Sequence, residues 1–172
     1  MMKYILDSNV FIEPHRTYYA FDFAPGFWKQ FANVLQKQEV IVLDTVYREI
    51  TEDKSDRLAE WIRQVKGFNK IFAHKDTTVS KIYGEVLKYV ETCGFYKTVA
   101  LVKWAQDTIA DPWLIAAAKA WNAIIITKET KKGQLSQKEP SASAKIPDVA
   151  AHFEVRCENL FFLMREMGIR WK

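Results

Sequence analysis

The chain contains short, continuously apolar runs separated by longer segments in which apolar residues recur every three or four positions. Because a strand in a parallel sheet is covered on both faces, it reads as an unbroken apolar run rather than as an alternation. Residues 4–6, 40–43 and 124–126 are such runs and predict buried parallel strands. A last strand is predicted at 153–157, and 70–74 is interpreted as a short extended piece.

The segments between the strands have the spacing of amphipathic helices. Asp44 and Asp111 each stand at the start of such a segment and are predicted to cap a helix N-terminus. The long segment that follows Asp44 has a predicted break near 53–55. The predicted helices cover residues 25–36, 46–65, 77–92, 99–105, 112–121, 146–152 and 160–167.

Two further segments lack this periodicity. The aromatic-rich stretch from residue 13 to the Pro25-Gly26 pair is interpreted as a loop that packs into the core, with a lid as the alternative. Residues 131–143 are rich in Ser and Lys and are predicted to be the flexible part of the chain.

The 172 residues are predicted to form a single domain, residues 1–172, because a chain of this length can bury one sizeable core. A composition of 49% hydrophobic and 27% charged residues is typical of a soluble protein, and we expect no membrane span. The N-terminus lacks the pattern of a cleavable signal, so a cytoplasmic location is expected. Cys93 and Cys157 have no metal-binding spacing and are interpreted as reduced, packed thiols.

The alternation of strands and helices predicts an α/β protein, a three-layer α/β/α sandwich around a mostly parallel central sheet of about four to five strands. Ligands of such proteins bind at the carboxyl ends of the strands. Asp7, Glu49, Asp111 and Glu129 each follow a predicted strand or lie at the start of a helix beside one. Four carboxylates at one edge repel each other unless a cation neutralises them, and oxygen ligands suit Mg²⁺ or Mn²⁺. A metal held there supports hydrolysis of a phosphodiester bond.

These segments resemble the PIN domain superfamily of metal-dependent ribonucleases, which includes the toxins of many toxin–antitoxin pairs. The resemblance is carried by YILDSNVFI at 4–12, VYREI around Glu49, ADPWLIAAAKAWNAIIIT at 110–127 and the Thr127-Lys128-Glu129 ending. RTYYAFDFAPGFW at 16–28 and a Lys-Ile-Pro-Asp motif at 145–148 resemble one PIN-like branch. The likeness covers nearly the whole chain.

The resemblance implies an endoribonuclease whose catalytic, metal-binding residues are Asp7, Glu49, Asp111 and Glu129. Asn9 and Thr127 would support them through hydrogen bonds. Glu129 matches a position that is more often Asp in the superfamily, which leaves open whether one or two metals bind. Asp148 is an additional acid near this edge, interpreted first as compensating the dipole of the helix that Pro147 begins. An RNA substrate, a small protein antitoxin and a homodimer are also implied.

Binding of RNA requires basic residues around the acidic edge, because phosphate contacts supply most of the affinity. The net charge of +4 permits attraction to a polyanion. Tyr18 and Tyr19 are candidates for stacking on unpaired bases. The candidate phosphate-binding residues are Arg16, Arg48, Lys128, Lys131, Lys132, Lys138 and Lys145.

Two alternative functions stay open from the sequence. A phosphohydrolase of the haloacid dehalogenase type also begins with a strand that ends in Asp, but that chemistry needs a second acid two residues later. Here the residue is Asn9, which argues against the phosphohydrolase. The other alternative is a catalytically silent PIN-like module that binds RNA or a protein, for which Glu129 in place of the commoner Asp is the support.

Overall fold

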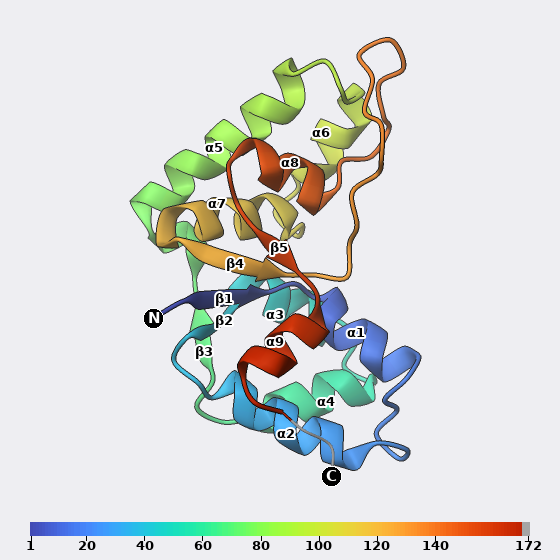
Figure 1. Ribbon diagram of the computed structural model, residues 1–172, viewed down its shortest axis with the longest axis vertical. Coiled ribbons are helices and arrows are strands. Elements are labelled where there is room, and N and C mark those ends of the chain that lie inside the picture. The colour runs from blue at the N-terminus through green and yellow to red at the C-terminus, as the bar shows by residue number, and fades with distance from the viewer. Residues whose placement is uncertain (170–172) are drawn as a thin grey trace.

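The computed structural model describes residues 1–169 and has a parallel sheet at its centre. The sheet has the strand order β3-β2-β1-β4-β5, and every neighbouring pair is parallel. This confirms the predicted three-layer α/β/α sandwich (Figure 1). The strands are β1 (Lys3–Leu6), β2 (Val40–Leu43), β3 (Asn69–Ile71), β4 (Ala123–Ile126) and β5 (Cys157–Glu158).

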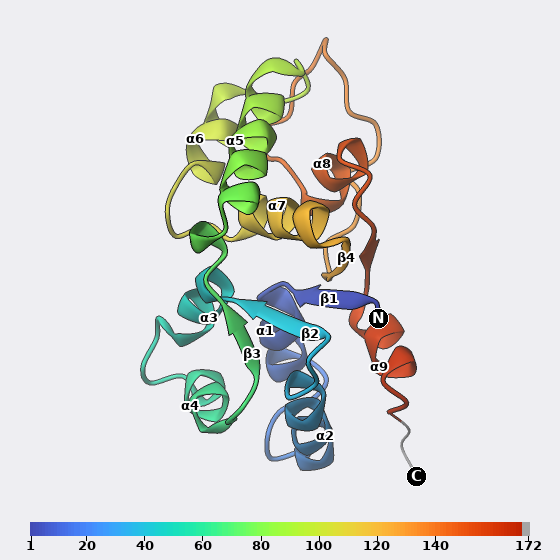
Figure 2. The ribbon, with the colours of Figure 1, turned by 90° about the vertical axis from the view of Figure 1, so that its left-hand side faces the viewer.

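Helices cover both faces of the sheet. Helices α5 (Thr77–Thr92), α6 (Thr98–Trp104), α7 (Asp111–Trp121) and α8 (Ile146–His152) lie on one side (Figures 1 and 2). On the other side lie α1 (Asn9–Arg16), α2 (Pro25–Leu35), α4 (Arg57–Gln64) and α9 (Leu160–Glu166), while α3 (Asp44–Thr51) continues directly from β2. Among residues 1–169, no helix combines the length and the apolar character that crossing a membrane requires.

The three central strands are held together by buried aliphatic side chains. Ile5 of β1 pairs in register with Ile41 of β2 and Ile125 of β4, and all three side chains are buried. Removing such side chains from water stabilises the fold by about 1.5–3 kcal/mol each. Because Leu6 is in register with Ile126, the residues after β1 and β4 emerge side by side, and the Asp7 amide donates to the Ile126 carbonyl at 2.9 Å.

The segment after Asp7 is helical as far as Arg16, so the prediction of a loop was wrong for residues 13–16, whereas residues 17–24 have no helix or strand, as predicted. Helix α1 runs through Pro14, which lacks the amide proton that a helix interior normally uses. Tertiary packing outweighs this loss because Val10, Phe11 and Pro14 are all buried. The sequence signal of a helix breaker was therefore overridden by burial of one helix face.

The aromatic residues around α2 form part of the core, as predicted. The Phe21 ring stacks on Trp28 with centroids 4.4 Å apart, and Trp28 meets Trp61 of α4 edge-on at 4.8 Å. Tyr19 stacks on Phe27 at 4.4 Å. Tyr18, by contrast, is 70% exposed. Of the two tyrosines proposed to stack on unpaired bases, Tyr18 is therefore the one presented to solvent.

Three boundary predictions need correction. Asp44 and Asp111 are the first residues of α3 and α7, and the capping positions are occupied by Leu43 and Ala110. The Asp44 carboxylate accepts a hydrogen bond from the Ala73 amide at 3.3 Å, so it joins β2 to the segment after β3. The last strand begins at Cys157, not at residue 153, because the chain first turns through Glu154 at a φ of 57° and only then reaches the β4 backbone.

Of two connecting segments singled out in the sequence, the first has the predicted form and the second is tethered by hydrogen bonds. The predicted break near 53–55 separates α3 from α4, where the Asp56 side chain caps α4 by accepting from the Leu58 amide at 2.8 Å. Residues 127–145 contain no helix or strand, yet hydrogen bonds tether this stretch to the helical layer. Ser141 forms an isolated β-bridge with Tyr96, and the side-chain Nε2 of Gln137 donates to the Cys93 carbonyl at 2.9 Å.

Candidate active site

Asp7 lies at the centre of a hydrogen-bonded group at the carboxyl end of β1. It is only 3% exposed. Its Oδ2 accepts from Asn9 Nδ2 at 2.5 Å and from Thr127 Oγ1 at 2.7 Å, while Ser8 Oγ lies 3.5 Å from Oδ1. The side-chain oxygen of Asn9 in turn accepts from the Lys128 amide at 2.7 Å. These bonds fix the Asp7 carboxylate between the ends of β1 and β4.

Asp7 and Asp111 are the two carboxylates whose protonation the fold disturbs most clearly. Burial, together with the charges of Glu129 and Glu49 and against the hydrogen bond from Thr127, raises the pKa of Asp7 to about 6. Burial also raises the pKa of Asp111 to about 7, together with the charges of Asp7, Glu129 and Glu49. The charges of Glu49 and Glu129 act on both Asp7 and Asp111, and the charge of Asp7 acts on Asp111, so the fold brings these four acids into one electrostatic group.

Glu49 joins this group from α3. Partial burial raises the pKa of its carboxyl, and a hydrogen bond from Ser8 opposes that effect. Ser8 thereby lies between Asp7 and Glu49, since its hydroxyl is near both carboxylates. Glu49 also lines a hollow of about 330 Å³ together with Arg16 at the end of α1.

Glu129 is engaged in contacts of its own. Its Oε1 accepts from Lys145 Nζ at 2.9 Å, and its Oε2 accepts from the Ile146 amide at 2.8 Å. The Glu129 amide donates to Thr127 Oγ1 at 3.0 Å. Both carboxylate oxygens of Glu129 thus hold the start of α8, and the carboxylate clamps this helix to the stretch that follows β4.

We predict that Glu129→Gln lowers the free energy of unfolding by about 1–3 kcal/mol, because the carboxamide can satisfy only one of the two donors. Chemical denaturation monitored by circular dichroism measures the change. Lys119→Met is the matched control, since the Lys119–Glu154 pair is a surface ion pair whose loss should cost less than about 1 kcal/mol. Equal stability of Glu129→Gln and the wild type would contradict the clamp.

Asp148 contacts a different part of the structure. It lies in the first turn of α8, where a negative charge opposes the helix dipole. Its Oδ2 accepts from the Lys132 amide at 3.0 Å and so anchors the polar stretch after β4. Asp148 contributes to the raised pKa values of Lys145 and Tyr96, which places its charge on the side of α8 that faces these residues.

The donor chemistry of the acidic edge fits a hard divalent cation. Asp7, Glu49 and Asp111 offer oxygen atoms only, which are the ligands that Mg²⁺ and Mn²⁺ prefer. The raised pKa values of all three mean that a positive charge between them would be favourable. Within residues 1–169, however, no three His, Cys, Asp or Glu side chains are already arranged to hold one ion. The fit lies in charge and ligand type, not in a preformed cage.

A model of one protein family matches residues 4–171, and its description is "Domain of unknown function (DUF4411)". The chain belongs to the DUF4411 family. Since the match spans both β1 and α9, it includes all the acidic residues described above. Comparison of this DUF4411 chain with curated protein sequences gives no match.

Among solved structures, the DUF4411 chain is similar to a chain of VapBC2 from Rickettsia felis, which was crystallised bound to a DNA fragment from the promoter. The TM-score is 0.54 at 14% sequence identity, and the alignment covers 92% of this chain and 98% of that chain. At this level of identity the likeness concerns the fold alone. It agrees with the α/β sandwich that the sequence predicts.

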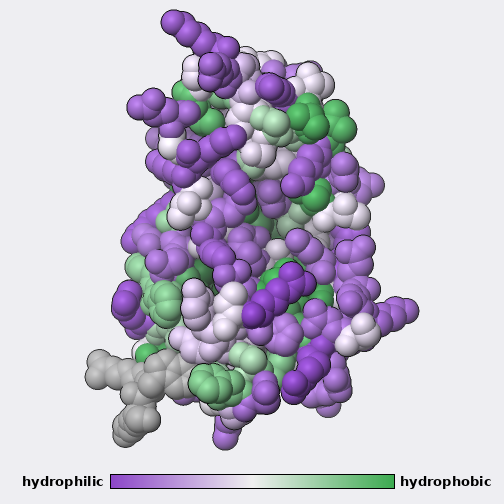
Figure 3. Space-filling model, turned by 90° about the vertical axis from the view of Figure 1, so that its right-hand side faces the viewer, coloured by the Kyte–Doolittle hydropathy of each residue, from purple (hydrophilic) through white to green (hydrophobic). Residues whose placement is uncertain are grey.

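Most candidate phosphate-binding residues of the DUF4411 chain have partners within the protein. Lys128 forms an ion pair with Glu13, and Arg48 donates to the Asp107 carbonyl at 3.2 Å. Lys132 Nζ donates to Ser141 Oγ at 2.5 Å. Lys131 and Lys138 are exposed residues of the stretch after β4. The face toward which β1 and β4 point is largely hydrophilic, with small hydrophobic patches (Figure 3).

Two residues that contribute to the acidic edge were not identified from the sequence. Ser8 is buried and interacts with both Asp7 and Glu49. Lys103 of α6 lowers the pKa values of Asp111 and Glu49, so its positive charge faces these acids. The position of Ser8 next to Asp7 was a usable signal. Lys103 had no comparable signal, because only the packing of α6 in the folded structure, against α5, brings its charge near these acids.

Proposed function

We propose that this DUF4411 protein is a metal-dependent endoribonuclease that hydrolyses RNA phosphodiester bonds. The observation that carries the proposal is the grouping of Asp7, Glu49 and Asp111 at the carboxyl edge of the parallel sheet, with all three pKa values raised. Structural ion pairs do not account for this grouping, because acids that repel one another destabilise the fold unless they serve a ligand.

In this proposal Asp7, Glu49 and Asp111 hold Mg²⁺ or Mn²⁺, directly or through water, and Glu129 supports them from the stretch that follows β4. The bound metal would lower the pKa of a water molecule and polarise the phosphoryl oxygen. Asn9 and Thr127 keep the Asp7 carboxylate in one orientation through their hydrogen bonds at 2.5 and 2.7 Å. Lys103 supplies a positive charge close to Asp111, where a phosphate group can be attracted.

We also propose that the protein acts as the toxin of a toxin–antitoxin pair, with a small protein antitoxin as partner and a homodimer as the assembly. The resemblance of the sequence to PIN toxins supports this role. Similarity of the fold to a chain of VapBC2, a complex crystallised on promoter DNA, supports it further.

The exposed Lys131 and Lys138 provide positive charge for the RNA backbone.

The test is cleavage of single-stranded RNA by the purified protein. We expect cleavage with added Mg²⁺ or Mn²⁺, and its loss when EDTA removes the metal, because the acidic edge then lacks its neutralising charge. The Asp44→Asn variant is the control for loss of a buried acid outside the proposed metal site, because Asp44 lies at the end of β2 and contacts the Ala73 amide. It should cleave RNA as the wild type does. Cleavage that EDTA leaves unchanged would sink the proposal.

One alternative function has a specific observation in its favour. The carboxylate of Glu129 is occupied by Lys145 and the Ile146 amide, and the acids of residues 1–169 are not arranged as a ready metal cage. These facts favour a catalytically silent module that binds RNA or a protein. RNA binding that persists in EDTA, with no cleavage in any metal, would support the silent module over the nuclease.

The phosphohydrolase alternative of the haloacid dehalogenase type has less support. Asn9 stands two residues after Asp7 and donates its amide proton to the Asp7 carboxylate. An amide in this role cannot transfer a proton as a general acid or base. Formation of a phospho-aspartate at Asp7 with a phosphate-ester substrate would reverse this conclusion.

A further inference from the structure

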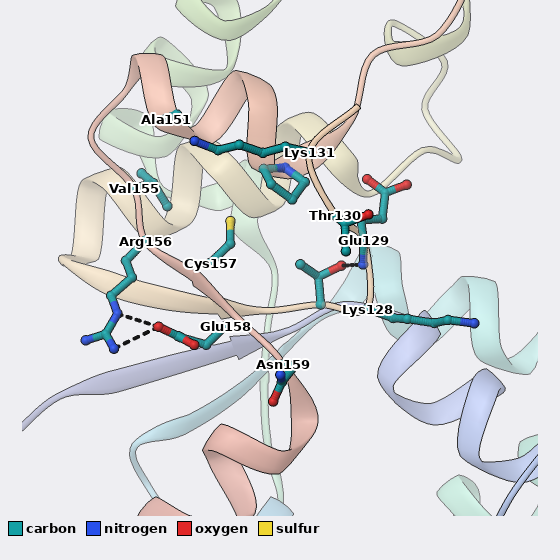
Figure 4. Close-up of a pocket in the computed structure, with 12 residues that line it drawn as sticks. Lys128, Glu129, Thr130, Lys131, Ala151, Val155, Arg156, Cys157, Glu158 and Asn159 are labelled. Carbon is teal, nitrogen blue, oxygen red and sulfur yellow. Dashed lines mark hydrogen bonds and ion pairs between the residues drawn. The ribbon is translucent and has the colours of Figure 1, made fainter. Parts of the chain in front are cut away.

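A pocket of about 500 Å³ adjoins the acidic edge, and we name it the β5 pocket. It is lined by residues 127–131, by Pro147 and Ala151 of α8, and by residues 155–159 around β5 (Figure 4). Its volume lies within the range of about 300–1,000 Å³ that is usual for small-ligand sites. Thr127 belongs both to the wall of this pocket and to the hydrogen-bonded group around Asp7.

One part of the pocket wall is apolar. Pro147, Val155 and Cys157 line it, and the sulfur of Cys157 points into the space between β5 and Lys131 (Figure 4). Burial raises the pKa of the Cys157 thiol to about 12, so the thiol stays neutral and behaves as an apolar group near neutral pH. A flat, mostly apolar ring system can pack against such a wall.

The remaining wall offers polar groups at its rim. Arg156 Nε and an Arg156 terminal nitrogen both lie 2.8 Å from Glu158 Oε1, so this ion pair uses one oxygen of the carboxylate (Figure 4). Glu158 Oε2 stands outside that pair and can accept a further hydrogen bond. Asn159 Oδ1 accepts from the Phe162 amide at 2.9 Å, so the Asn159 side chain has only its Nδ2 group to offer a ligand.

A positive charge covers the opening. Lys131 extends across the pocket with its ammonium end toward α8 (Figure 4). An apolar wall, a carboxylate acceptor and a lysine at the mouth together match a nucleotide, whose base is flat, whose amino group donates and whose phosphate is negative. The shared Thr127 places this nucleotide beside the acidic edge.

We propose that the β5 pocket binds an unpaired nucleobase of the RNA substrate next to the cleaved bond, and that Glu158 favours bases with an exocyclic amino group. This inference rests on the proposed ribonuclease function. Adenine, cytosine and guanine carry such an amino group, whereas uracil does not. Uracil offers only its ring N3–H, which is flanked by two carbonyl oxygens that repel a carboxylate, so Glu158 discriminates against uracil at this one position.

The first test measures binding in EDTA, where no metal-dependent cleavage takes place. Short, labelled single-stranded RNAs that carry A, C, G, U or an abasic site at one position are compared by fluorescence anisotropy. We expect amino-bearing bases to bind roughly tenfold more tightly than uracil or the abasic site, as the loss of one hydrogen bond to a charged acceptor implies. Glu158→Gln should reduce this preference to within about twofold.

The second test fills the pocket. Ala151 is exposed on α8, so Ala151→Phe can be tolerated by the fold while its ring occupies the pocket. We expect this variant to bind all five RNAs as weakly as the wild type binds the abasic RNA. Asn33→Phe, which places the same ring on an exposed position of α2 across the sheet, is the control and should retain the base preference.

The outcomes separate the two proposals. Metal-dependent cleavage with no base preference, and with Ala151→Phe behaving as the wild type, would overturn the β5 pocket and leave the nuclease standing. A base preference that Ala151→Phe and Glu158→Gln both remove, without cleavage in any metal, would support the pocket and refute the nuclease. Loss of binding to the same extent in Asn33→Phe would also overturn the pocket assignment.

Discussion

Asp7→Asn should reduce RNA cleavage by at least about 100-fold while the protein stays folded, because even residues that only support metal ligands contribute about 10–100-fold. The carboxamide has nearly the shape of the carboxylate. Its oxygen can accept from Asn9 and Thr127 in place of Oδ2, while its NH₂ group faces Ser8. What the variant loses is the negative charge that a divalent cation requires.

The measurement is the rate of cleavage in saturating Mg²⁺ or Mn²⁺, with wild type and variant purified in the same way. Sequencing of the RNA ends distinguishes cuts made by this protein from background cuts. Asp44→Asn provides the control, since it removes another buried carboxylate at a strand end. If Asp7→Asn cleaved at the wild-type rate, Asp7 would have no role in catalysis.

The second large effect concerns stability against pH in the absence of metal. We expect the free energy of unfolding to fall as the pH rises from about 4 to about 7, because the folded protein binds more protons than the unfolded chain over this range. The reason is that Asp111 and Asp7 have pKa values of about 7 and about 6 when folded, against an ordinary value of 3.8. Below the ordinary value both states are protonated, and above about pH 7 the penalty is complete.

A shift of this size for Asp111 corresponds to on the order of 4 kcal/mol. The penalties of Asp7 and Asp111 overlap, because part of each comes from repulsion involving the same acids. Asp111→Asn should therefore be more stable than the wild type at neutral pH, and its stability should depend less on pH. Mg²⁺ should stabilise the wild type at neutral pH and have a smaller effect on Asp111→Asn.

Urea denaturation in EDTA across this pH range, and again with Mg²⁺, measures these differences. Asp22→Asn, which changes an exposed carboxylate, is the control and should follow the wild-type curve. A wild-type stability that rises steadily between about pH 4 and pH 7 in EDTA would refute the repulsion among the buried acids.

The sequence alone was sufficient for the layers of the fold. Unbroken apolar runs at β1, β2 and β4 specify strands that are covered on both faces, and this property depends only on residues that follow one another in the chain. The same local pattern placed Asp7 directly after a buried strand. Parallel topology then brought Thr127 beside it, as the hydrogen bond at 2.7 Å shows.

Several features were decided by tertiary structure. Helix α1 forms despite Pro14 because its apolar face is buried, and the last strand starts only where the β4 backbone can pair with it. The partners of Glu129 are Lys145 and the Ile146 amide, residues 16 and 17 positions away in the chain. Lys103 reaches the acidic edge through the packing of its helix.

The difference between the two groups has a physical reason. Periodicity records which faces of a segment are buried, so it can be read locally and determines the elements and the order of the acids. The charge state and the hydrogen-bond partners of an acid depend on groups that are distant in sequence and on exclusion from water. The sequence by itself therefore determined that acids gather at one edge. Only the tertiary structure decided that Asp7 is buried and Asp111 half-buried beside it, while Glu129 holds the start of α8.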